Sequence, residues 1–342
     1  YTANQALVEA VAAFAPQADT NVLSEIGAHV GAEAFQQQAE IVNTQTPELQ
    51  THDRWGNRID HVEFHPAYHE IMRASLSYGN HSYAWTNDEE GANADRAARF
   101  SLFAQIEPGH ACPISMTHAV VPSLLGTDLE EFWVPRLTST DYDPRLIDPA
   151  EKTALTFGMA MTEKQGGSDV RANSTVAEPP GDHYLLTGHK WFCSAPQSDA
   201  FLVLAKLPEG VSCFLVPRVL PGGDRNPFFI QRLKNKLGNK SNASSEIELN
   251  NTKGWLVGEP GAGVRTIIEM VARTRLDCVI GSTAGMRQSV AEAAWHARER
   301  EAFGTKLIDQ PLMRSVLADL QLESEAATWT MMHLAAAHDD DS

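Results

Sequence analysis

Basic side chains, cysteines and long apolar runs are scarce in this sequence, and each shortage excludes a class of protein. The 342 residues carry 27 Lys and Arg against 44 Asp and Glu, so the formal net charge is −17. Such a surplus of carboxylates disfavours nonspecific nucleic-acid binding, in which Lys and Arg neutralise phosphates. No apolar run reaches the roughly 18 residues of a transmembrane helix, so we expect no membrane span.

The four cysteines, Cys112, Cys193, Cys213 and Cys278, are scattered singly, without the spacing of a disulfide framework or a metal site. That pattern favours a reducing compartment, and no secretory leader opens the chain, so we expect a cytoplasmic protein. The first residue is Tyr1 rather than Met, which indicates a processed chain or a fragment. A hydrophobic content of 43% and a charged content of 21% are typical of soluble proteins with one large core or a few domains.

Hydrophobic patterning changes twice along the chain. Apolar spacing near the helical period predicts helices over 4–14, 24–39, 95–106 and 116–125, followed by a polar linker at 141–152. Short runs of Val, Leu and Phe between Gly, Pro and Asp predict strands over 155–161, 183–188, 200–206, 211–217 and 245–249. The helical period returns from 263 to about 303 and from Pro311 to about 337. The regular strand spacing indicates a small β-barrel or sandwich.

The stretch from Met161 to Asp169, Met-Thr-Glu-Lys-Gln-Gly-Gly-Ser-Asp, directly follows the apolar run 155–160. Adjacent glycines and hydroxyls at the end of a strand leave backbone N–H groups accessible, with no bulky side chain in the way. Such a loop can lie against the polar edge of a cofactor or a phosphate, and it is equally compatible with a well-made turn. A second stretch favours the cofactor, because Gly188 to Ala195, Gly-His-Lys-Trp-Phe-Cys-Ser-Ala, sets two aromatic rings beside a hydroxyl.

Both stretches resemble signatures of the acyl-CoA dehydrogenase flavoprotein superfamily, Thr-Glu-x-x-x-Gly-Ser-Asp and Gly-x-Lys-x-aromatic-x-Thr/Ser. A third stretch, Arg232 to Ser244, resembles the adaptive-response AidB branch of that superfamily, and the likeness covers nearly the whole chain. The resemblance implies an α+β multidomain fold with an N-terminal helical domain at 1–152 and a middle β-barrel or sandwich at 153–260. A C-terminal helical bundle, incomplete here, is expected at 261–342.

The resemblance also implies FAD as the cofactor and α,β-dehydrogenation of an acyl-CoA thioester, an oxidation of a CH–CH donor, as the reaction. Thr162 is expected to bond the polar edge of the flavin, Phe192 to pack on the ring where the family usually has Trp, and Ser194 to lie near N5. Because neighbouring strand residues face opposite sides, Trp191 is expected to serve packing. The full set of expected cofactor contacts is Met159, Ala160, Met161, Thr162, Glu163, Lys164, Gln165, Gly166, Gly167, Ser168, Phe192, Cys193, Ser194 and Arg300.

Two residues have expected roles beyond the flavin ring. In the family, the position of Ser168 faces the acyl thioester or its pantetheine arm, and the alternative is a turn hydroxyl that caps its own backbone. Arg300 opens an Arg-x-x-Phe-Gly run whose Arg reaches the flavin pyrophosphate of a neighbouring subunit, and the alternative is a surface ion pair with Glu299 or Glu301. The first role needs a homo-oligomer, and the family is usually tetrameric. The Gln that the family places eleven residues after this Arg falls at ten here, as Gln310.

The family's catalytic base is a Glu in a Trp-Glu-Gly-Ser-Gly-like loop, and no such motif occurs in these 342 residues. We therefore name no catalytic base and expect it, with the last core helices, beyond Ser342. The DNA-binding region of this branch is likewise expected in a C-terminal domain beyond this chain. Two other functions stay open. One is a flavin-containing protein that binds or protects DNA and has little dehydrogenase activity, and the other is a flavin oxidase or monooxygenase on the same scaffold. The resemblance implies the role in the response to DNA alkylation for the dehydrogenase itself.

Three histidines carry a weaker signal. His61, His65 and His69 are spaced by four, as zinc ligands on one helical face can be. Pro66 is expected to start a helix after His65, which breaks that face, and no Cys supports the site. We therefore expect no metal.

Two patterns border the last helical region. The run from Gly258 to Gly263 is rich in glycine but lacks the order of a phosphate loop and its following Lys, so a domain-joining turn is expected. Arg275 and Asp277 fall inside the long helix, where the family has an Arg at the mouth of the active site. A structural ion pair is the alternative for these two residues.

Overall fold

The computed structural model describes residues 1–179 and 181–339, which divide into two compact units. Each unit combines segments that lie far apart in the sequence. The segments are Tyr1–Gln36, Tyr83–Ala111 and the chain from Arg275 onward in the helical unit, and Gln37–Ser82 and Cys112–Thr274 in the β unit. None of the helices described combines the length and the apolar character needed to cross a membrane.

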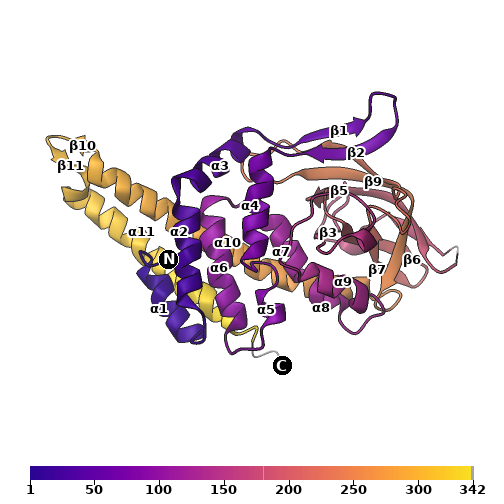
Figure 1. Ribbon diagram of the computed structural model, residues 1–342, viewed down its shortest axis with the longest axis horizontal. Helices are drawn as coiled ribbons and strands as arrows, with labels where there is room; N and C mark the ends of the chain where they lie inside the picture. The colour runs from indigo at the N-terminus through magenta and orange to yellow at the C-terminus, as the bar shows by residue number, and fades with distance from the viewer. Residues whose placement is uncertain (180, 340–342) are drawn as a thin grey trace. The chain divides into compact units, whose positions relative to one another are not determined.

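Helices make up most of the helical unit. They are α1 (Gln5–Phe14), α2 (Thr20–Gly31), the start of α3 (Glu33–Thr44), α5 (Tyr83–Thr86), α6 (Ala92–Ile106), the greater part of α10 (Gly263–Glu299) and α11 (Pro311–Ala336). A short hairpin, β10 (Glu301–Ala302) with β11 (Thr305–Lys306), leads from α10 through the 3-10 turn η3 (Leu307–Asp309) to α11 (Figure 1). Local chemistry sets the helix starts: the Asn4 side chain caps α1 by accepting from the Leu7 N–H, and Pro311 opens α11.

A buried ion pair joins α6 to α10 inside the helical unit. Arg96 donates from Nη1 and Nη2 to the two carboxylate oxygens of Asp277, at 2.6 and 2.8 Å. The two side chains are only 1% and 3% exposed. A bidentate contact of this kind satisfies both charged groups where water cannot reach them. Of the roles left open for Asp277, the structure therefore shows the structural ion pair.

The β unit contains a short hairpin, a group of helices and the main sheet. Its helices and 3-10 turns are the remainder of α3, α4 (Pro66–Ser77), α7 (Ala111–Ala119), α8 (Val121–Leu124), α9 (Glu130–Leu137), η1 (Pro149–Glu151), η2 (Val170–Ala172) and the first turns of α10. Its strands are β1 (Glu48–His52), β2 (Arg58–Glu63), β3 (Phe157–Ala160), β4 (Val176–Glu178), β5 (Tyr184–Ser194), β6 (Ala200–Leu207), β7 (Gly210–Pro217), β8 (Phe228–Leu233) and β9 (Ser244–Val257).

The main sheet closes on itself. β6 pairs with β7, β7 with β9, β9 with β5, β5 with β4, and β4 returns to β6. β3 adds to β6 in parallel, and β8 adds to β9. Figure 1 shows these strands around a common interior. On one face of β6 and β7, Leu202, Leu204 and Leu215 pack against Val120 and Leu124 of the adjacent helical segment. The predicted barrel is therefore confirmed, and its buried strands are the near-continuous apolar runs that the sequence shows.

Most element predictions hold, but three do not. The stretch 116–125 is the end of α7 followed by α8 rather than one helix, and α10 ends at Glu299, short of the expected 303. The predicted helix over 24–39 is wrong as a single element, because the backbone is extended at Ala32 and the chain breaks there into α2 and α3. Pro66 does start a helix, α4, and the His65 side chain caps its N-terminus by accepting from the Ala67 N–H. Strands β1, β2, β4 and β8 escaped prediction because they are short or half-exposed and lack a continuous apolar run.

Candidate functional site

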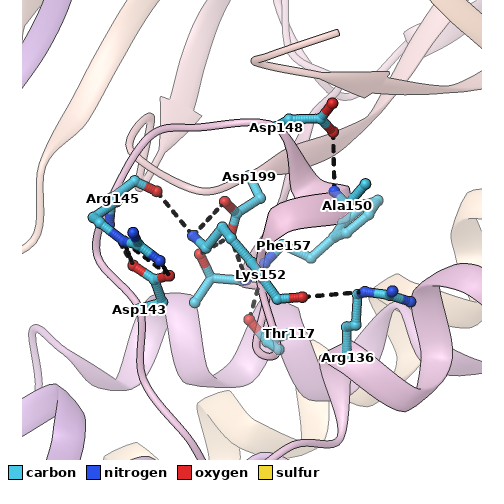
Figure 2. Close-up of polar contacts among 10 residues, drawn as sticks. Thr117, Arg136, Asp143, Arg145, Asp148, Ala150, Lys152, Phe157 and Asp199 are labelled. Atoms are coloured by element: carbon cyan, nitrogen blue, oxygen red, sulfur yellow. Dashed lines mark hydrogen bonds and ion pairs between the residues drawn. The ribbon is translucent and has the colours of Figure 1, made fainter. Parts of the chain in front are cut away.

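The strand that precedes the glycine-rich loop is fixed at its start by a buried polar network. Asp199 Oδ2 accepts from the Thr156 N–H at 2.8 Å, and Lys152 Nζ donates to Asp199 Oδ1 at 2.7 Å. Figure 2 shows Lys152 between Asp199 and the backbone carbonyl of Arg145. The network sets the start of β3, and therefore the point at which the loop from Met161 begins.

Lys152 and Asp199 also line a cavity of about 320 Å³ in the β unit, away from the predicted cofactor residues. His61 on β2 and His69 on α4 line it too, with His69 Nδ1 lying 2.8 Å from the Tyr142 hydroxyl oxygen. His65 instead caps α4. His61 and His69 thus border one cavity while His65 serves a helix cap, and in the described part of the chain no cluster of His, Cys, Asp and Glu is arranged to hold a metal.

The loop from Met161 to Ser168 is open along one side. From Lys164 to Ser168 every residue is exposed, and Gly166, with φ of +139°, has no neighbouring atom within 4 Å of the position a Cβ would take. Gly167 differs, because a Cβ there would lie 2.6 Å from Thr162 Oγ1 and 3.0 Å from Thr162 Cγ2. Glycine is needed at 167 so that the loop backbone can approach the hydroxyl of Thr162, the residue expected to meet the polar edge of a flavin.

The buried side chain of Glu163 fixes this loop to neighbouring segments of the chain. Its Oε1 accepts from Lys190 Nζ at 2.8 Å and from the Thr175 hydroxyl at 2.6 Å, and its Oε2 accepts from the Ser174 N–H at 2.6 Å. The side chains of Glu163 and Lys190 are both 0% exposed. Because its carboxylate is enclosed and saturated with donors, Glu163 can meet a cofactor only through its backbone. Sequence reasoning missed the contribution of Ser174 and Thr175, because two hydroxyl residues in a polar stretch carry no distinctive signal.

The ionisation of this buried pair follows from its contacts. Burial by itself raises the pKa of Glu163, but the hydrogen bonds from Lys190, the Ser174 N–H and the Thr175 hydroxyl outweigh it and hold the pKa well below its ordinary value. Burial lowers the pKa of Lys190, and the Glu163 carboxylate opposes that shift. Glu163 is therefore ionised at neutral pH and serves to position the loop.

Backbone contacts join the loop to β5, which carries the second motif. The Trp191 N–H donates to the Thr162 carbonyl at 2.8 Å, and the Lys164 N–H donates to His189 Nε2 at 2.9 Å. The two motifs that lie apart in the sequence are therefore one structural element. Its buried side holds the Glu163–Lys190 pair, and its exposed side is the loop from Lys164 to Ser168.

The aromatic pair on β5 departs from simple strand alternation. The ladder between β5 and β9 is irregular between Lys190 and Cys193, which is a β-bulge that redirects the intervening side chains. Phe192 is 45% exposed, and Trp191 is half-buried. Lys234 Nζ lies 3.8 Å from the ring centroid of Trp191 and 4.5 Å from that of Phe192, so one ammonium contacts both rings. Trp191 was expected to serve packing and Phe192 the cofactor. Because of the bulge, the two side chains do not simply face opposite sides of the strand, and both rings contact the same ammonium.

The remaining β5 residues lie beside the aromatic pair. Ser194 is half-buried, and its hydroxyl oxygen lies 3.3 Å from that of Ser244 on β9. Cys193 is fully buried, and burial raises the pKa of its thiol to about 12. Ala160 is also fully buried. Ser194 is thus only partly covered, whereas Cys193 and Ala160 can offer only backbone groups.

A basic cavity of about 850 Å³ lies in the same unit as the loop. Its cations are Arg171, Lys206 and Arg265, and its lining residues include no carboxylate. Within the described residues these three side chains form no ion pair. Gly261 also lines it, so the domain-joining turn predicted there borders a cavity suited to phosphate. Sequence reasoning missed the three cations because they come from a loop, a strand and a helix far apart in the chain.

Three family models match the chain in succession. The adaptive response protein AidB N-terminal domain matches residues 1–144, the acyl-CoA dehydrogenase middle domain matches 158–252, and the acyl-CoA dehydrogenase C-terminal domain matches 261–342. The chain belongs to the acyl-CoA dehydrogenase family. Its predicted resemblance to the AidB branch is confirmed by the first of these matches.

Known relatives and solved structures agree with this family. AidB of Escherichia coli (strain K12) is 47% identical over 99% of this chain and 63% of its own length, and acyl-CoA dehydrogenase family member 11 of Caenorhabditis elegans is 29% identical over 92% and 52%. The crystal structure of Caenorhabditis elegans ACDH-11 in complex with C11-CoA gives a TM-score of 0.84 at 27% identity, covering 94% of this chain and 57% of that one. The apo form of Bd2924 gives 0.89 at 26%, covering 99% and 70%.

The family assignment applies to the residues of this chain, which correspond to only part of each relative. The chain spans less than two thirds of the length of the two relatives just named. The order of a helical region, a β-barrel and a second helical region is the acyl-CoA dehydrogenase fold and confirms the predicted fold class.

Arg300, the expected pyrophosphate ligand of this acyl-CoA dehydrogenase family member, belongs to the helical unit. It follows the end of α10, and its side chain is exposed and forms no ion pair with Glu299 or Glu301 among the described residues. Gln310 donates from Nε2 to the Ala302 carbonyl at 2.9 Å, so it stabilises the hairpin beside Arg300. Arg300 is thus available for an anionic partner, and Gln310 is occupied locally.

Glu163→Gln tests the buried pair through stability. The substitution leaves Lys190 charged and buried without its partner, so we expect a loss of about 3–5 kcal/mol at neutral pH. Folding lowers the pKa of Glu163, so its contribution is complete above the ordinary value of 4.5 and is lost as the pH falls below that value. Urea unfolding across a pH series should show a gap between wild type and variant that is constant above 4.5 and shrinks below it.

Glu178→Gln is the matched control, because Glu178 is exposed on β4 and carries the same substitution. It should track the wild type at every pH. A Glu163→Gln variant as stable as wild type at neutral pH, or a gap that does not change in acid, contradicts the account of the pair.

Proposed function

We propose that the protein is an FAD-dependent oxidoreductase that dehydrogenates the α,β carbon–carbon bond of an acyl-CoA thioester. The observation that carries the proposal is the junction of the two motifs. The open loop from Thr162 to Ser168 and the exposed ring of Phe192 form one element, in the same unit as a cavity lined by three cations that pair with no carboxylate among the described residues. Family membership supports the same reaction class.

The residues at the junction suit a flavin. A flat ring system with one polar edge needs donors and hydroxyls at that edge and an aromatic face beside it. Thr162 offers its hydroxyl next to Gly167, Ser194 offers a second hydroxyl, and Phe192 offers an exposed ring. Bound FAD supplies the hydride acceptor. The protein's own groups hold it in place and orient it, because Glu163 prevents the loop from moving relative to β5.

The basic cavity suits the phosphates of CoA. Arg171, Lys206 and Arg265 present positive charge without competing carboxylates, and the N-terminus of α10 adds its dipole. Arg171 lies three positions after Ser168, so the thioester arm and the phosphates of one molecule can be bound by adjacent segments. In support, the nematode relative was crystallised with C11-CoA.

The proton-abstracting base is not assigned to this chain. Glu163 is excluded because both of its oxygens already accept hydrogen bonds in an enclosed site. A base must lie within hydrogen-bond reach of the α-carbon's proton. We therefore name no base among the residues described.

We infer a homo-oligomer for the whole protein. Arg300 is exposed and unpaired in the described chain, as expected of a residue that binds a neighbour's pyrophosphate. Large apolar side chains are also exposed on α10 and α11, among them Trp295 at 62% and Leu312 at 79%. Such apolar faces are typical of surfaces that another chain or segment covers.

Anaerobic titration of the flavin-loaded whole protein with acyl-CoA tests the function and the cavity together. Visible flavin absorbance should bleach with acyl-CoA in the wild type. Arg265→Ala removes a charged contact with phosphate, so half-bleaching should need about tenfold more acyl-CoA. Acyl-pantetheine, which lacks the nucleotide phosphates, should bleach wild type and variant equally.

Arg54→Ala is the control, because Arg54 is an exposed cation on the turn between β1 and β2 and does not line the cavity. It should leave both titrations unchanged. A wild-type protein that is yellow but stays oxidised with every acyl-CoA contradicts the dehydrogenase and favours the DNA-binding flavoprotein. Equal losses with acyl-CoA and acyl-pantetheine would place the phosphates elsewhere.

Gly167→Ala tests the flavin loop. The new Cβ forces the Thr162 hydroxyl to move, and Thr is stiff about χ1, so the hydrogen bond expected from Thr162 is weakened. We expect FAD to dissociate about tenfold more readily, measured by flavin fluorescence on titration of the apoprotein. Gly181→Ala is the control, because a Cβ at Gly181 meets nothing within 4 Å. Unchanged FAD affinity in Gly167→Ala would remove Thr162 from the site.

A further inference from the structure

The aromatic pair on β5, Trp191 and Phe192, lies among cations. Lys234 Nζ is 3.8 Å from the ring centroid of Trp191, while Lys164 Nζ and Arg232 Cζ lie 5.6 and 5.8 Å from it. Lys234 also lies over Phe192, at 4.5 Å from its centroid. An ammonium over an aromatic face is attracted by the ring quadrupole, and the attraction increases where water is excluded.

Lys234 is held firmly in this position. Its side chain is only 10% exposed, and its Nζ donates to Glu246 Oε1 at 3.0 Å. Arg232 contacts the same carboxylate oxygen at 2.7 Å. One carboxylate is thus shared by two cations, so the trio of Lys234, Arg232 and Glu246 keeps a net positive charge beside the rings.

The position of Lys234 leaves one face of Phe192 for a ligand. The ammonium occupies one face of the ring, and the side chain is still 45% exposed. A planar group stacked on the opposite face at the usual ~3.5 Å would lie roughly 8 Å from the charge. That separation is about one Debye length at physiological salt, and partly buried charges are screened less than exposed ones.

We propose that Lys234 is a positioning residue that acts through Phe192: it fixes the ring against which the flavin stacks and raises the flavin's reduction potential. The inference rests on the proposed function. In that reaction the substrate's β-carbon gives a hydride, two electrons and one proton, to the flavin, and the α-proton goes to the base. The flavin becomes more negative by one charge, which a nearby cation stabilises.

The test is the midpoint potential of the FAD-loaded protein, measured by dye-coupled reductive titration. Lys234→Met keeps the chain length and removes the charge, so the reduced-to-oxidised ratio at a fixed poise should fall about tenfold, or ~30 mV for this two-electron couple. Lys234→Arg should restore the wild-type potential. Lys240→Met is the matched control, a lysine of the same segment with no ring contact in the described residues, and it should change nothing.

Glu246→Gln tests the same charge with the opposite sign. It removes the carboxylate that partly neutralises Lys234 and Arg232, so the potential should rise. If Lys234→Met fails to retain FAD, the midpoint potential of this variant still tests whether the Lys234 charge acts on the flavin. An unchanged potential in a flavin-loaded Lys234→Met protein, or a lowered one in Glu246→Gln, overturns the role of Lys234 and leaves the proposed function intact. A wild-type protein that cannot be loaded with FAD overturns both.

Discussion

The ion pair between Glu163 and Lys190 is the constraint on which the site depends. Removing two charges from water costs several kcal/mol for each ion, and only a full set of hydrogen bonds offsets that cost. The structure supplies that set from Ser174 and Thr175, on the segment that follows the loop. The loop, β5 and this segment are therefore fixed to one another, and a flexible glycine-rich stretch can present its backbone in a defined place.

The chain as a whole is acidic, whereas the candidate site is locally basic. The net charge of −17 is distributed over the surface, yet the basic cavity and the surroundings of Trp191 are positive. A local positive field in an acidic protein attracts small anions without promoting nonspecific contact with nucleic acid. This division fits a ligand that carries phosphates, such as a CoA thioester or a dinucleotide, better than it fits a polymer.

The sequence predicted the large features because they have local signals. The barrel strands are apolar runs, Pro66 and Pro311 mark helix starts, and the two motifs are contiguous. The bulge at Trp191 could not be predicted, because it depends on pairing with β9, and alternation alone assigns that ring to packing. Arg171, Lys206 and Arg265 meet only in three dimensions. The ion pair between Arg96 and Asp277 could not be predicted for the same reason, because 181 positions separate the two residues in the sequence.

The most direct test of the account is amide hydrogen exchange in wild type and Lys190→Met. The Thr175 N–H donates to Glu163 Oε1, and the Trp191 N–H donates to the Thr162 carbonyl. If the buried pair holds the loop against β5, both amides should lose protection together in the variant, while the β6–β7 ladder keeps its protection. Wild-type protection of the Trp191 amide in a folded Lys190→Met protein would show that the loop is held by something else and would contradict the account.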